Sequence, residues 1–178
     1  MQSPITADPL EAFLNQPDIE ESPAWELING RSQQKPMPTL FHSRLQRNLV
    51  IAINQQTQQY EAIQELRCII PPFSPVPDIA VIAIDRLPKT DGPFQGAPDW
   101  LIEIRSPDQS TLKLQEKILH CISKGTQLAW LIDIRRQQVW AWQAQDLPLI
   151  YSGDEPLPTL DEVPAMTVAS VIAMTKQR

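Results

Sequence analysis

Two stretches of the chain carry apolar residues at helical spacing. The first spans residues 39–60, where apolar side chains recur every three or four positions after Thr39, a residue type that favours the N-cap of a helix. The second spans residues 111–124 and is followed by Gly125, which is typical of a C-terminal helix cap. The pattern therefore predicts two long helices, and shorter helices are expected at residues 9–14 and 168–174.

Short runs rich in Ile, Val and aromatic residues predict the strands. The expected strands are residues 25–28, 31–34, 62–70, 78–84, 97–105, 128–134, 139–143 and 149–151. Asn29-Gly30, between the first two, is a strong signal for a tight hairpin turn. Residues 128–134 are nearly all apolar, which indicates a strand that is buried on both faces of a sheet.

The order of these elements indicates the topology. Strands 78–84 and 97–105 come first, the helix over residues 111–124 follows, and strand 128–134 comes last. A right-handed crossover would join the last two strands as parallel neighbours. We therefore expect an α/β protein of mixed α+β type, in which helices flank a mixed β-sheet and a β-hairpin lies near the N-terminus.

Charge is unevenly distributed over the 178 residues. Residues 1–26 carry six acidic residues and no Lys or Arg, residues 27–145 carry 13 basic and 10 acidic residues, and residues 146–178 carry two basic and five acidic residues. The net charge of −6 argues against strong non-specific binding to DNA, although the central part is basic. Ordinary scatter of charge would also give this distribution. We divide the chain into an acidic segment with a short helix, residues 1–23, and one domain, residues 24–178.

The composition is that of a soluble globular protein, with 42% apolar and 20% charged residues. No apolar run approaches the roughly 20 residues that span a bilayer, and the N-terminus lacks the pattern of a signal peptide. Cys68 and Cys121 are too few for a disulfide framework or a zinc site. We therefore expect a reduced, cytoplasmic protein that does not enter a membrane.

Asp78 and Glu103 are the leading candidates for chemistry. They lie on neighbouring expected strands, so their carboxylates could share one hard cation through oxygen ligands. Glu103 sits inside an apolar strand, where an ionised acid is unfavourable unless it is paired or binds a cation. Strand alternation places Arg105 on the same face, so an Arg105–Glu103 ion pair is the alternative explanation. Asp99 could compete with Asp78 as a ligand, but Asp78 lies across from Glu103 on the preceding strand.

Lys117 is the candidate basic residue. It lies three residues after Leu114 and four before Cys121, at the edge of the apolar stripe of its helix, from where it could reach the sheet. An ammonium group there could neutralise charge that builds on a phosphoryl oxygen, or orient an attacking water. The alternative is a surface lysine whose aliphatic stem covers the helix.

Three other ionisable residues have open roles. Glu26 could be an additional acidic ligand or a surface charge of the hairpin. His42, near the start of a helix, could contact a phosphate or be a structural histidine, and His120 beside Lys117 has the same alternatives. The five tryptophans fall mostly in expected strands, which favours core packing.

Several separated motifs follow one another along the chain. They are Pro77-Asp78-Ile, Gly96-Ala-Pro-Asp-Trp-Leu-Ile-Glu103-Ile-Arg-Ser106-Pro, Lys117, Gly125 and Trp130-Leu-Ile-Asp133, preceded by Trp25-Glu26-Leu-Ile-Asn-Gly30 and His42. In order and spacing, they resemble the Uma-two family of restriction-endonuclease-like proteins, a branch of the PD-(D/E)XK nuclease superfamily. The similarity covers residues 24–172 of the chain.

This resemblance implies a metal-dependent endonuclease with a restriction-endonuclease-like fold. Asp78 and Glu103 match the two carboxylates of the core motif, and the Ile104 carbonyl would be a third ligand of Mg²⁺ or Mn²⁺. Arg105 stands where the superfamily usually has a lysine, and Lys117 matches the helix lysine that takes over this role in the family. The partner would be a nucleic acid, and DNA is the expected substrate.

A non-catalytic binding or regulatory protein that retains the nuclease fold is the alternative function. The acidic ends of the chain and the lack of a recognisable DNA-reading module favour it. We also expect a homodimer, because the segment Leu128–Gln143 carries Trp130, Trp140 and Trp142, more aromatic surface than one small sheet edge needs.

Overall fold

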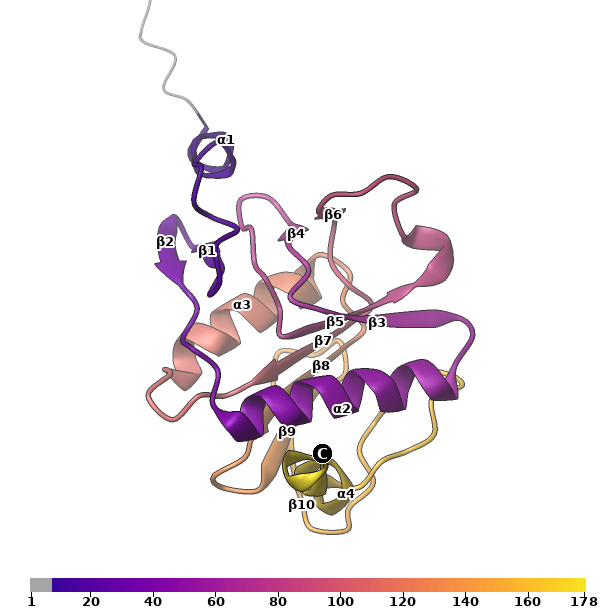
Figure 1. The fold of residues 1–178 in the computed structure, drawn as a ribbon. Coiled ribbons are helices and arrows are strands. Elements are labelled where there is room, and N and C mark those ends of the chain that lie inside the picture. The colour runs from indigo at the N-terminus through magenta and orange to yellow at the C-terminus, as the bar shows by residue number, and fades with distance from the viewer. Residues whose placement is uncertain (1–7) are drawn as a thin grey trace, which may run out of the picture.

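A six-stranded mixed sheet forms the centre of the structure. The computed structural model describes residues 8–178, and Figure 1 shows its ribbon. The strands lie in the order β10-β9-β8-β7-β5-β3. Their bounds are Tyr60–Gln64 for β3, Ile79–Ala83 for β5, Trp100–Ile104 for β7, Leu128–Asp133 for β8, Gln138–Trp142 for β9 and Leu149–Ser152 for β10. The expected fold class, a mixed sheet flanked by helices, is confirmed.

One pair of strands in this sheet is parallel. β7 and β8 run in the same direction and are joined by helix α3, Thr111–Ser123. The pairs β3–β5, β5–β7, β8–β9 and β9–β10 are antiparallel. The β-β-α-β order predicted from the sequence is therefore confirmed, because a helical crossover brings the following strand back beside the first.

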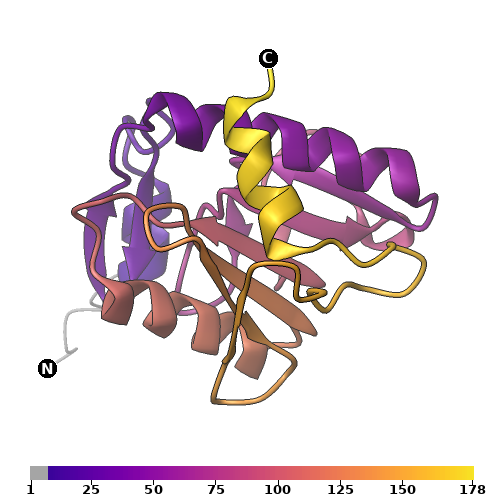
Figure 2. The ribbon, with the colours of Figure 1, turned by 90° about the horizontal axis from the view of Figure 1, so that it is seen from below.

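Helices cover both faces of the sheet. α2, Leu40–Gln56, and α4, Val168–Ala173, lie over one face and α3 lies over the other, as the view from below shows (Figure 2). The side chain of Thr39 accepts a hydrogen bond from the backbone N–H of His42, so Thr39 is the N-cap of α2 as predicted.

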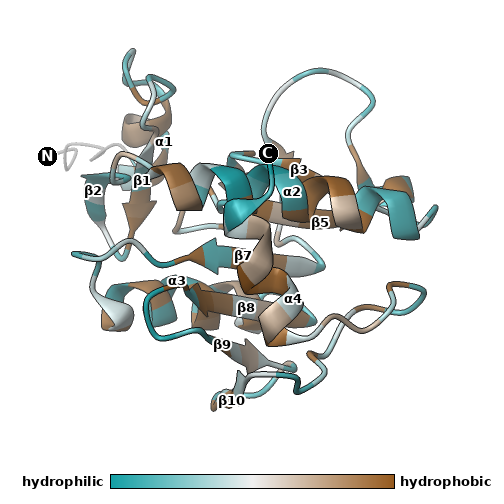
Figure 3. Ribbon diagram, turned by 60° about the horizontal axis from the view of Figure 1, so that its bottom comes forward, coloured by the Kyte–Doolittle hydropathy of each residue, from teal (hydrophilic) through white to brown (hydrophobic). Residues whose placement is uncertain are grey.

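Each face of the sheet packs its own core, because strand side chains alternate between the two faces. Ile79 and Val81 of β5 belong to the core that includes Leu45 of α2, whereas Ala80 belongs to the core that includes Ile118 of α3. Every residue of β7 and β8 is buried, and most of β8 has the colour of hydrophobic residues in Figure 3. A charged residue inside such a strand therefore needs a buried partner.

A small N-terminal unit packs beside the sheet. α1, Pro9–Leu14, lies where the sequence predicts a helix, and the hairpin strands β1, Trp25–Ile28, and β2, Arg31–Gln34, have the expected bounds. The Arg67 side chain holds this unit through hydrogen bonds to two of its backbone carbonyl groups. Residues 1–7 of the expected acidic segment lie outside the described residues, and its division from the domain at residue 24 stays a prediction.

The strand expected over residues 62–70 is in fact two strands. Glu65 follows β3 with a positive φ of 51°, and this turn directs the chain away from the main sheet. The next strand, β4, Cys68–Ile69, pairs in parallel with β6, Phe94–Gln95. The turn matters for the site, because it places the Glu65 side chain beside the start of β5.

Helix α2 ends at Gln56, before its predicted end at Tyr60. Tyr60 pairs with Ala83 as the first residue of β3, so sheet pairing overrides the helical pattern at this point. The remaining described elements are the short 3₁₀ helices Ile84–Arg86 and Met174–Lys176. Within residues 8–178, no helix is long and apolar enough to cross a membrane.

Candidate active site

Asp78 and Glu103 face each other across β5 and β7. In the antiparallel register Ile79 lies opposite Ile102, so the next pair along is Asp78 and Glu103. Residues directly opposite in this way have Cβ atoms roughly 5 Å apart and point to the same face of the sheet. Leu101, two residues before Glu103, packs in the core of the α3 face, so both carboxylates point to that face.

The carboxylate of Asp78 is buried and engaged on both oxygens. Oδ1 lies 2.9 Å from Nζ of Lys35, while Oδ2 accepts a 2.7 Å hydrogen bond from the backbone N–H of Ile104 and lies 3.3 Å from Nε2 of His42. Burial alone would raise the pKa of Asp78, but Lys35, His42 and the Ile104 N–H together hold that pKa well below its usual value. Asp78 therefore carries a negative charge at neutral pH.

Lys117 lies deep inside the protein and not at the edge of the buried face, where the sequence pattern placed it. Its side chain is only 2% exposed. Nζ donates a 2.8 Å hydrogen bond to Oε1 of Glu26 and lies 2.8 Å from Oε1 of Glu103. Burial lowers the pKa of Lys117, but attraction to Glu103 and Glu26 outweighs it and raises the pKa above its usual value. Lys117 therefore reaches the sheet as expected, and the surface-lysine alternative is wrong, because the N-terminal hairpin, which supplies Glu26, closes over this side of α3.

Glu26 belongs to the site and not to the surface of the hairpin. Its buried carboxylate accepts hydrogen bonds at Oε1 from Nζ of Lys117 and from the backbone N–H of Val76, both 2.8 Å long. The neighbouring Leu27 bridges to Ser74, so the hairpin packs on the loop that precedes β5. The interpretation of Glu26 as a surface charge of the hairpin is therefore wrong.

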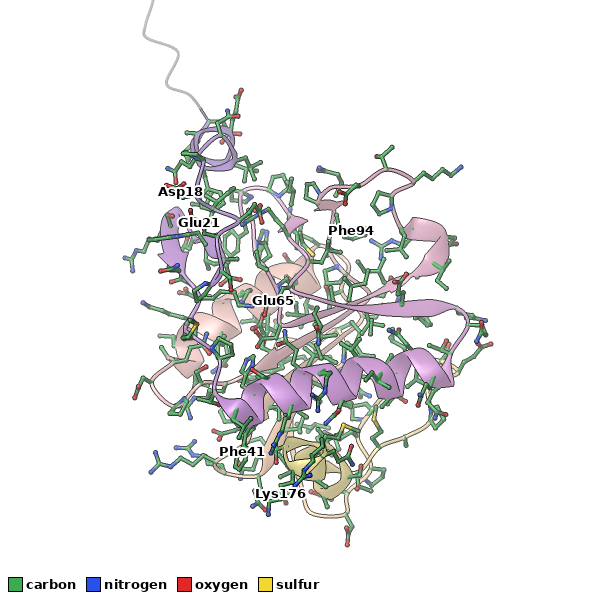
Figure 4. All side chains as sticks on the ribbon, viewed as in Figure 1. Asp18, Glu21, Phe41, Glu65, Phe94 and Lys176 are labelled. Atoms are coloured by element: carbon green, nitrogen blue, oxygen red, sulfur yellow. The ribbon has the colours of Figure 1, made fainter. Side chains whose placement is uncertain are left out.

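A second buried lysine, which no sequence pattern singled out, completes the cluster. Lys35 follows β2, and its side chain is 7% exposed. Its Nζ donates hydrogen bonds to Oε2 of Glu65 at 2.7 Å, to the carbonyl of Val76 at 2.8 Å and to Oδ1 of Asp78 at 2.9 Å. Burial lowers the pKa of Lys35, but the charges of Asp78 and Glu103 raise it above its usual value. In Figure 4, Glu65 lies between the N-terminal hairpin and α2.

The first two turns of α2 also contribute to the site. His42 and Gln46 are four residues apart and so share one side of the helix. The Gln46 amide donates hydrogen bonds to Oε1 of Glu65 at 2.9 Å and to the backbone carbonyl of Asp78 at 2.7 Å. Nδ1 of His42 is buried without a hydrogen-bond partner in the described part of the chain. The spacing of His42 and Gln46 is the one sequence signal that could have indicated this polar side of α2.

Arg105 pairs with Asp133 and not with Glu103, so the alternative explanation of an Arg105–Glu103 ion pair is wrong. Its guanidinium lies 3.1 Å from Oδ2 of Asp133, and its Nε donates a hydrogen bond to the carbonyl of Gln109. β7 ends at Ile104, and its parallel register with β8 brings Arg105 opposite Asp133 at the ends of the two strands. Arg105 therefore pairs with Asp133 on the neighbouring strand, and Lys117 is the basic residue beside Glu103.

Two other candidates have partners away from the carboxylate pair. Asp99 accepts a hydrogen bond from the backbone at the far end of β5, and its Oδ1 lies 2.8 Å from Arg86. The His120 ring stacks on Phe73 at a centroid distance of 3.9 Å, and its Nε2 lies 2.8 Å from the Ile70 carbonyl. Both arrangements are structural contacts.

The buried cluster holds more acids than bases. Three buried acids, Glu26, Asp78 and Glu103, face two buried lysines, Lys35 and Lys117, beside the imidazole of His42. Burial raises the pKa of Glu103 to about 8 against the pull of Lys117, and the charge of Asp78 adds to this effect. Without another cation, Glu103 therefore keeps a proton through most of the neutral pH range, and the cluster can balance one further positive charge.

Two adjoining cavities lead to this cluster. The first, of about 240 Å³, reaches Asp78, His42 and Glu65. The second, of about 620 Å³, reaches Glu26 and Lys117. Lys35 lines both cavities, and so do residues of the loop that joins β7 to α3. Asp78 therefore borders a cleft through which a substrate could approach it, while Glu103 lies buried behind the cavity wall.

The family assignment agrees with this arrangement. The model of the Uma2 family, described as "Putative restriction endonuclease", matches residues 10–173. The chain belongs to the Uma2 family. Among solved structures, it is similar to a protein from Anabaena variabilis ATCC 29413 described as "a putative nuclease belonging to DUF820". The two are 37% identical with a TM-score of 0.87, and the match covers 93% of this chain and 98% of that chain. No curated protein matches the chain.

Membership of Uma2 confirms the resemblance seen in the sequence motifs. It makes this chain a member of a restriction-endonuclease-like nuclease family, which implies a nucleic acid as its binding partner. The Uma2 match begins at residue 10, so it includes the hairpin that carries Glu26 and the segment that carries Lys35.

Proposed function

We propose that this Uma2 protein is a PD-(D/E)XK endonuclease that depends on Mg²⁺ or Mn²⁺ and hydrolyses phosphodiester bonds in DNA. The observation that carries this proposal is the opposed pair Asp78 and Glu103, with the ammonium group of Lys117 2.8 Å from Glu103. Two carboxylates that can share a cation, with a fixed positive charge beside them, suit phosphodiester hydrolysis. The restriction-endonuclease description of the family supports DNA as the substrate.

The donor atoms of the cluster fit Mg²⁺ or Mn²⁺. Mg²⁺ is usually held by one or two carboxylates and keeps several of its waters. Asp78 and Glu103 would supply the carboxylates, and the Ile104 carbonyl oxygen would be a third protein ligand. Water molecules would complete the coordination of the ion. The proton held by Glu103 would leave as the cation enters.

The other residues of the cluster have supporting roles in this proposal. When bound, the cation would act as a Lewis acid toward the phosphate and the attacking water. Lys117 orients Glu103 and places a positive charge where charge develops on the phosphoryl group. Glu26 fixes the ammonium of Lys117 from its other side. His42 contacts Asp78 and would hold its carboxylate in one orientation.

Arg105 would bind the substrate outside the reacting centre. With Arg135 and His42, it lines a separate cavity of about 460 Å³ beside the cleft. Its side chain is 21% exposed, so a nucleic acid could reach the guanidinium. Arginine forms paired hydrogen bonds with phosphate oxygens, and such backbone contacts position a nucleic acid without reading its sequence.

A cleavage assay tests the proposed function. Supercoiled plasmid, linear duplex, single-stranded DNA and RNA would be incubated with the protein and Mn²⁺ or Mg²⁺, with EDTA in parallel. We expect DNA cleavage that needs the metal and is lost in Glu103→Gln, which keeps the side-chain shape and removes the charge. Glu61→Gln, an exposed site on β3, is the matched control. Cleavage by Glu103→Gln at the wild-type rate would contradict the proposal.

Binding without catalysis is the second candidate function. The pairing within the cluster favours it, because both oxygens of Asp78 are engaged and Lys117 already has two acidic partners. Buried ion pairs of this kind can serve the fold alone. Nucleic-acid binding that needs no metal, together with no measurable Mn²⁺ affinity, would favour this function.

The proposal also includes a homodimer, but through a different surface. Trp130 and Trp142 are fully buried in the protein's own core, so they do not provide the expected aromatic surface. β10, at the edge of the sheet, instead exposes Leu149 and Ile150. An edge strand with apolar side chains offers unpaired backbone groups to a second copy of the chain.

A cytoplasmic location completes the proposal. Cys68 and Cys121 are both free thiols in the protein interior, and free thiols are typical of proteins from a reducing compartment.

A further inference from the structure

We propose that Lys35 is a tethered cation that occupies an oxygen cage formed by Glu65, Asp78 and the Val76 carbonyl, and that a divalent cation displaces it from this cage. The inference rests on the proposed metal dependence and extends it. It adds Glu65 and the Val76 carbonyl to the atoms that meet a cation, and it makes Lys35 the competitor of the metal.

The contacts of Lys35 are those of a cation in a built site. Its Nζ lies 2.7 to 2.9 Å from three oxygen atoms, one for each ammonium hydrogen. Two of these oxygens are carboxylate oxygens, from Glu65 and Asp78, and the third is a backbone carbonyl. Carboxylate and carbonyl oxygens are also the ligands that Mg²⁺ and Ca²⁺ prefer. The ammonium group therefore stands where an ion of the same preference could stand.

The cage is held in place by groups other than Lys35. Gln46 binds the second oxygen of Glu65 and also the backbone carbonyl of Asp78. The Ile104 N–H binds the second oxygen of Asp78. Each carboxylate thus has one oxygen that is held by Gln46 or by the Ile104 N–H, and its other oxygen faces Lys35. The cage would keep its shape when Lys35 leaves.

The Lys35 side chain has space outside the cage, and a cation can enter the cage in its place. It lies between β2 and α2, and its flexible four-carbon stem borders both cavities of the cleft. Because Lys35 lines both cavities, we infer that its ammonium turns from the smaller cavity toward the larger one. Glu65 is 44% exposed, so a hydrated ion can approach the cage from solvent. A hydrated ion has no such access to Lys117, because both of its acidic partners are buried.

Acylation of the wild-type protein tests this inference without a mutation. A lysine-acylating reagent would be applied with and without Mn²⁺, and mass spectrometry would follow each lysine. We expect Lys35 to be protected without Mn²⁺ and to react with Mn²⁺ at a rate close to that of the exposed Lys113. Lys117 should stay protected in both conditions. Continued protection of Lys35 when Mn²⁺ is bound, as judged by paramagnetic resonance of the ion, overturns the inference.

Mn²⁺ affinity of a charge-removing variant gives a second test. Lys35→Met should bind Mn²⁺ roughly tenfold more tightly or better than wild type, because a positive charge a few ångströms from the ion is gone. Lys35→Gln is the variant to use if the methionine disturbs folding, which circular dichroism would show. Lys113→Met is the matched control and should keep the wild-type affinity, since Lys113 is exposed.

The outcomes separate this inference from the proposed function. Equal Mn²⁺ affinity in wild type and in folded Lys35 variants overturns the inference and leaves metal dependence standing. Binding by the variants alone would show that Lys35 excludes the ion and is not displaced, which overturns both the inference and metal dependence of the wild-type protein. If neither wild type nor the variants bind Mn²⁺, the inference and the proposed metal dependence fall together.

Discussion

Replacement of Lys117 by methionine should destabilise the protein strongly at neutral pH. Methionine keeps the aliphatic stem and removes an ammonium group that lies 2.8 Å from both Glu26 and Glu103. All three side chains are buried, and removal of one partner from a buried ion pair typically costs about 3–5 kcal/mol. A lysine at the edge of the helix, as the sequence pattern predicted, would instead contribute at most about 1 kcal/mol. A buried Lys117 and an exposed Lys117 therefore predict measurably different losses of stability in Lys117→Met.

The pH dependence sharpens this prediction. Glu103, whose pKa is raised to about 8, already holds a proton at neutral pH in the wild-type protein, so loss of Lys117 obliges the cluster to hold one more. Uptake of this proton becomes less favourable as the pH rises, so the variant should lose more stability at pH 7 than at pH 5.

The direction of this pH dependence follows from proton binding by the folded and the unfolded variant. In the folded variant the buried cluster holds the additional proton, whereas the unfolded chain, whose carboxyl groups are in water, releases it as the pH rises. The unfolded state therefore binds fewer protons as the pH rises, and stability falls. The variant should lose stability relative to wild type between pH 5 and pH 7.

Urea denaturation of wild type and Lys117→Met at pH 5 and pH 7 measures this difference. Lys113→Met, one turn earlier on α3 and exposed, is the matched control and should change the free energy of unfolding by less than about 0.5 kcal/mol at either pH. A loss for Lys117→Met that is equal at the two pH values, or below about 1 kcal/mol at pH 7, would refute the reasoning. Nuclease activity of the folded variant should fall by a factor of roughly 10² or more.

Three further predictions follow from the same contacts. Wild-type stability should fall as the pH rises from 4.5 to about 8, because folded Glu103 keeps a proton that the unfolded chain loses, and the neutral variant Glu103→Gln should lack this fall in urea denaturation. Arg105→Gln should change the free energy of unfolding by less than about 1 kcal/mol and raise KM for DNA more than it lowers kcat; an equal loss of kcat would place Arg105 in the reacting centre. Light scattering should give a dimer mass for wild type and a monomer mass for Ile150→Lys, and a wild-type monomer at micromolar concentration would reject the dimer.

The sequence by itself determined most of the local structure. Thr39 marks the start of α2, Asn29-Gly30 marks the hairpin turn, and the apolar run before Asp133 marks a strand that is buried on both faces. These features depend on a few neighbouring residues, so they can be read without the fold. The position of Asp78 and Glu103 on adjacent strands could also be predicted, because both interrupt apolar runs next to a recognisable order of elements.

The tertiary structure alone decided how charge is arranged around this pair. Lys35 comes from a polar hairpin and Glu26 from its other strand, and neither differs from a surface residue in its local sequence. Both are buried only because the hairpin folds over the loop before β5 and over α3. Lys117 lies at a helix edge by spacing alone, and this covering turns it into a buried ion pair. Whether a charge is buried depends on the surface that closes over it, and segments distant in the chain supply that surface.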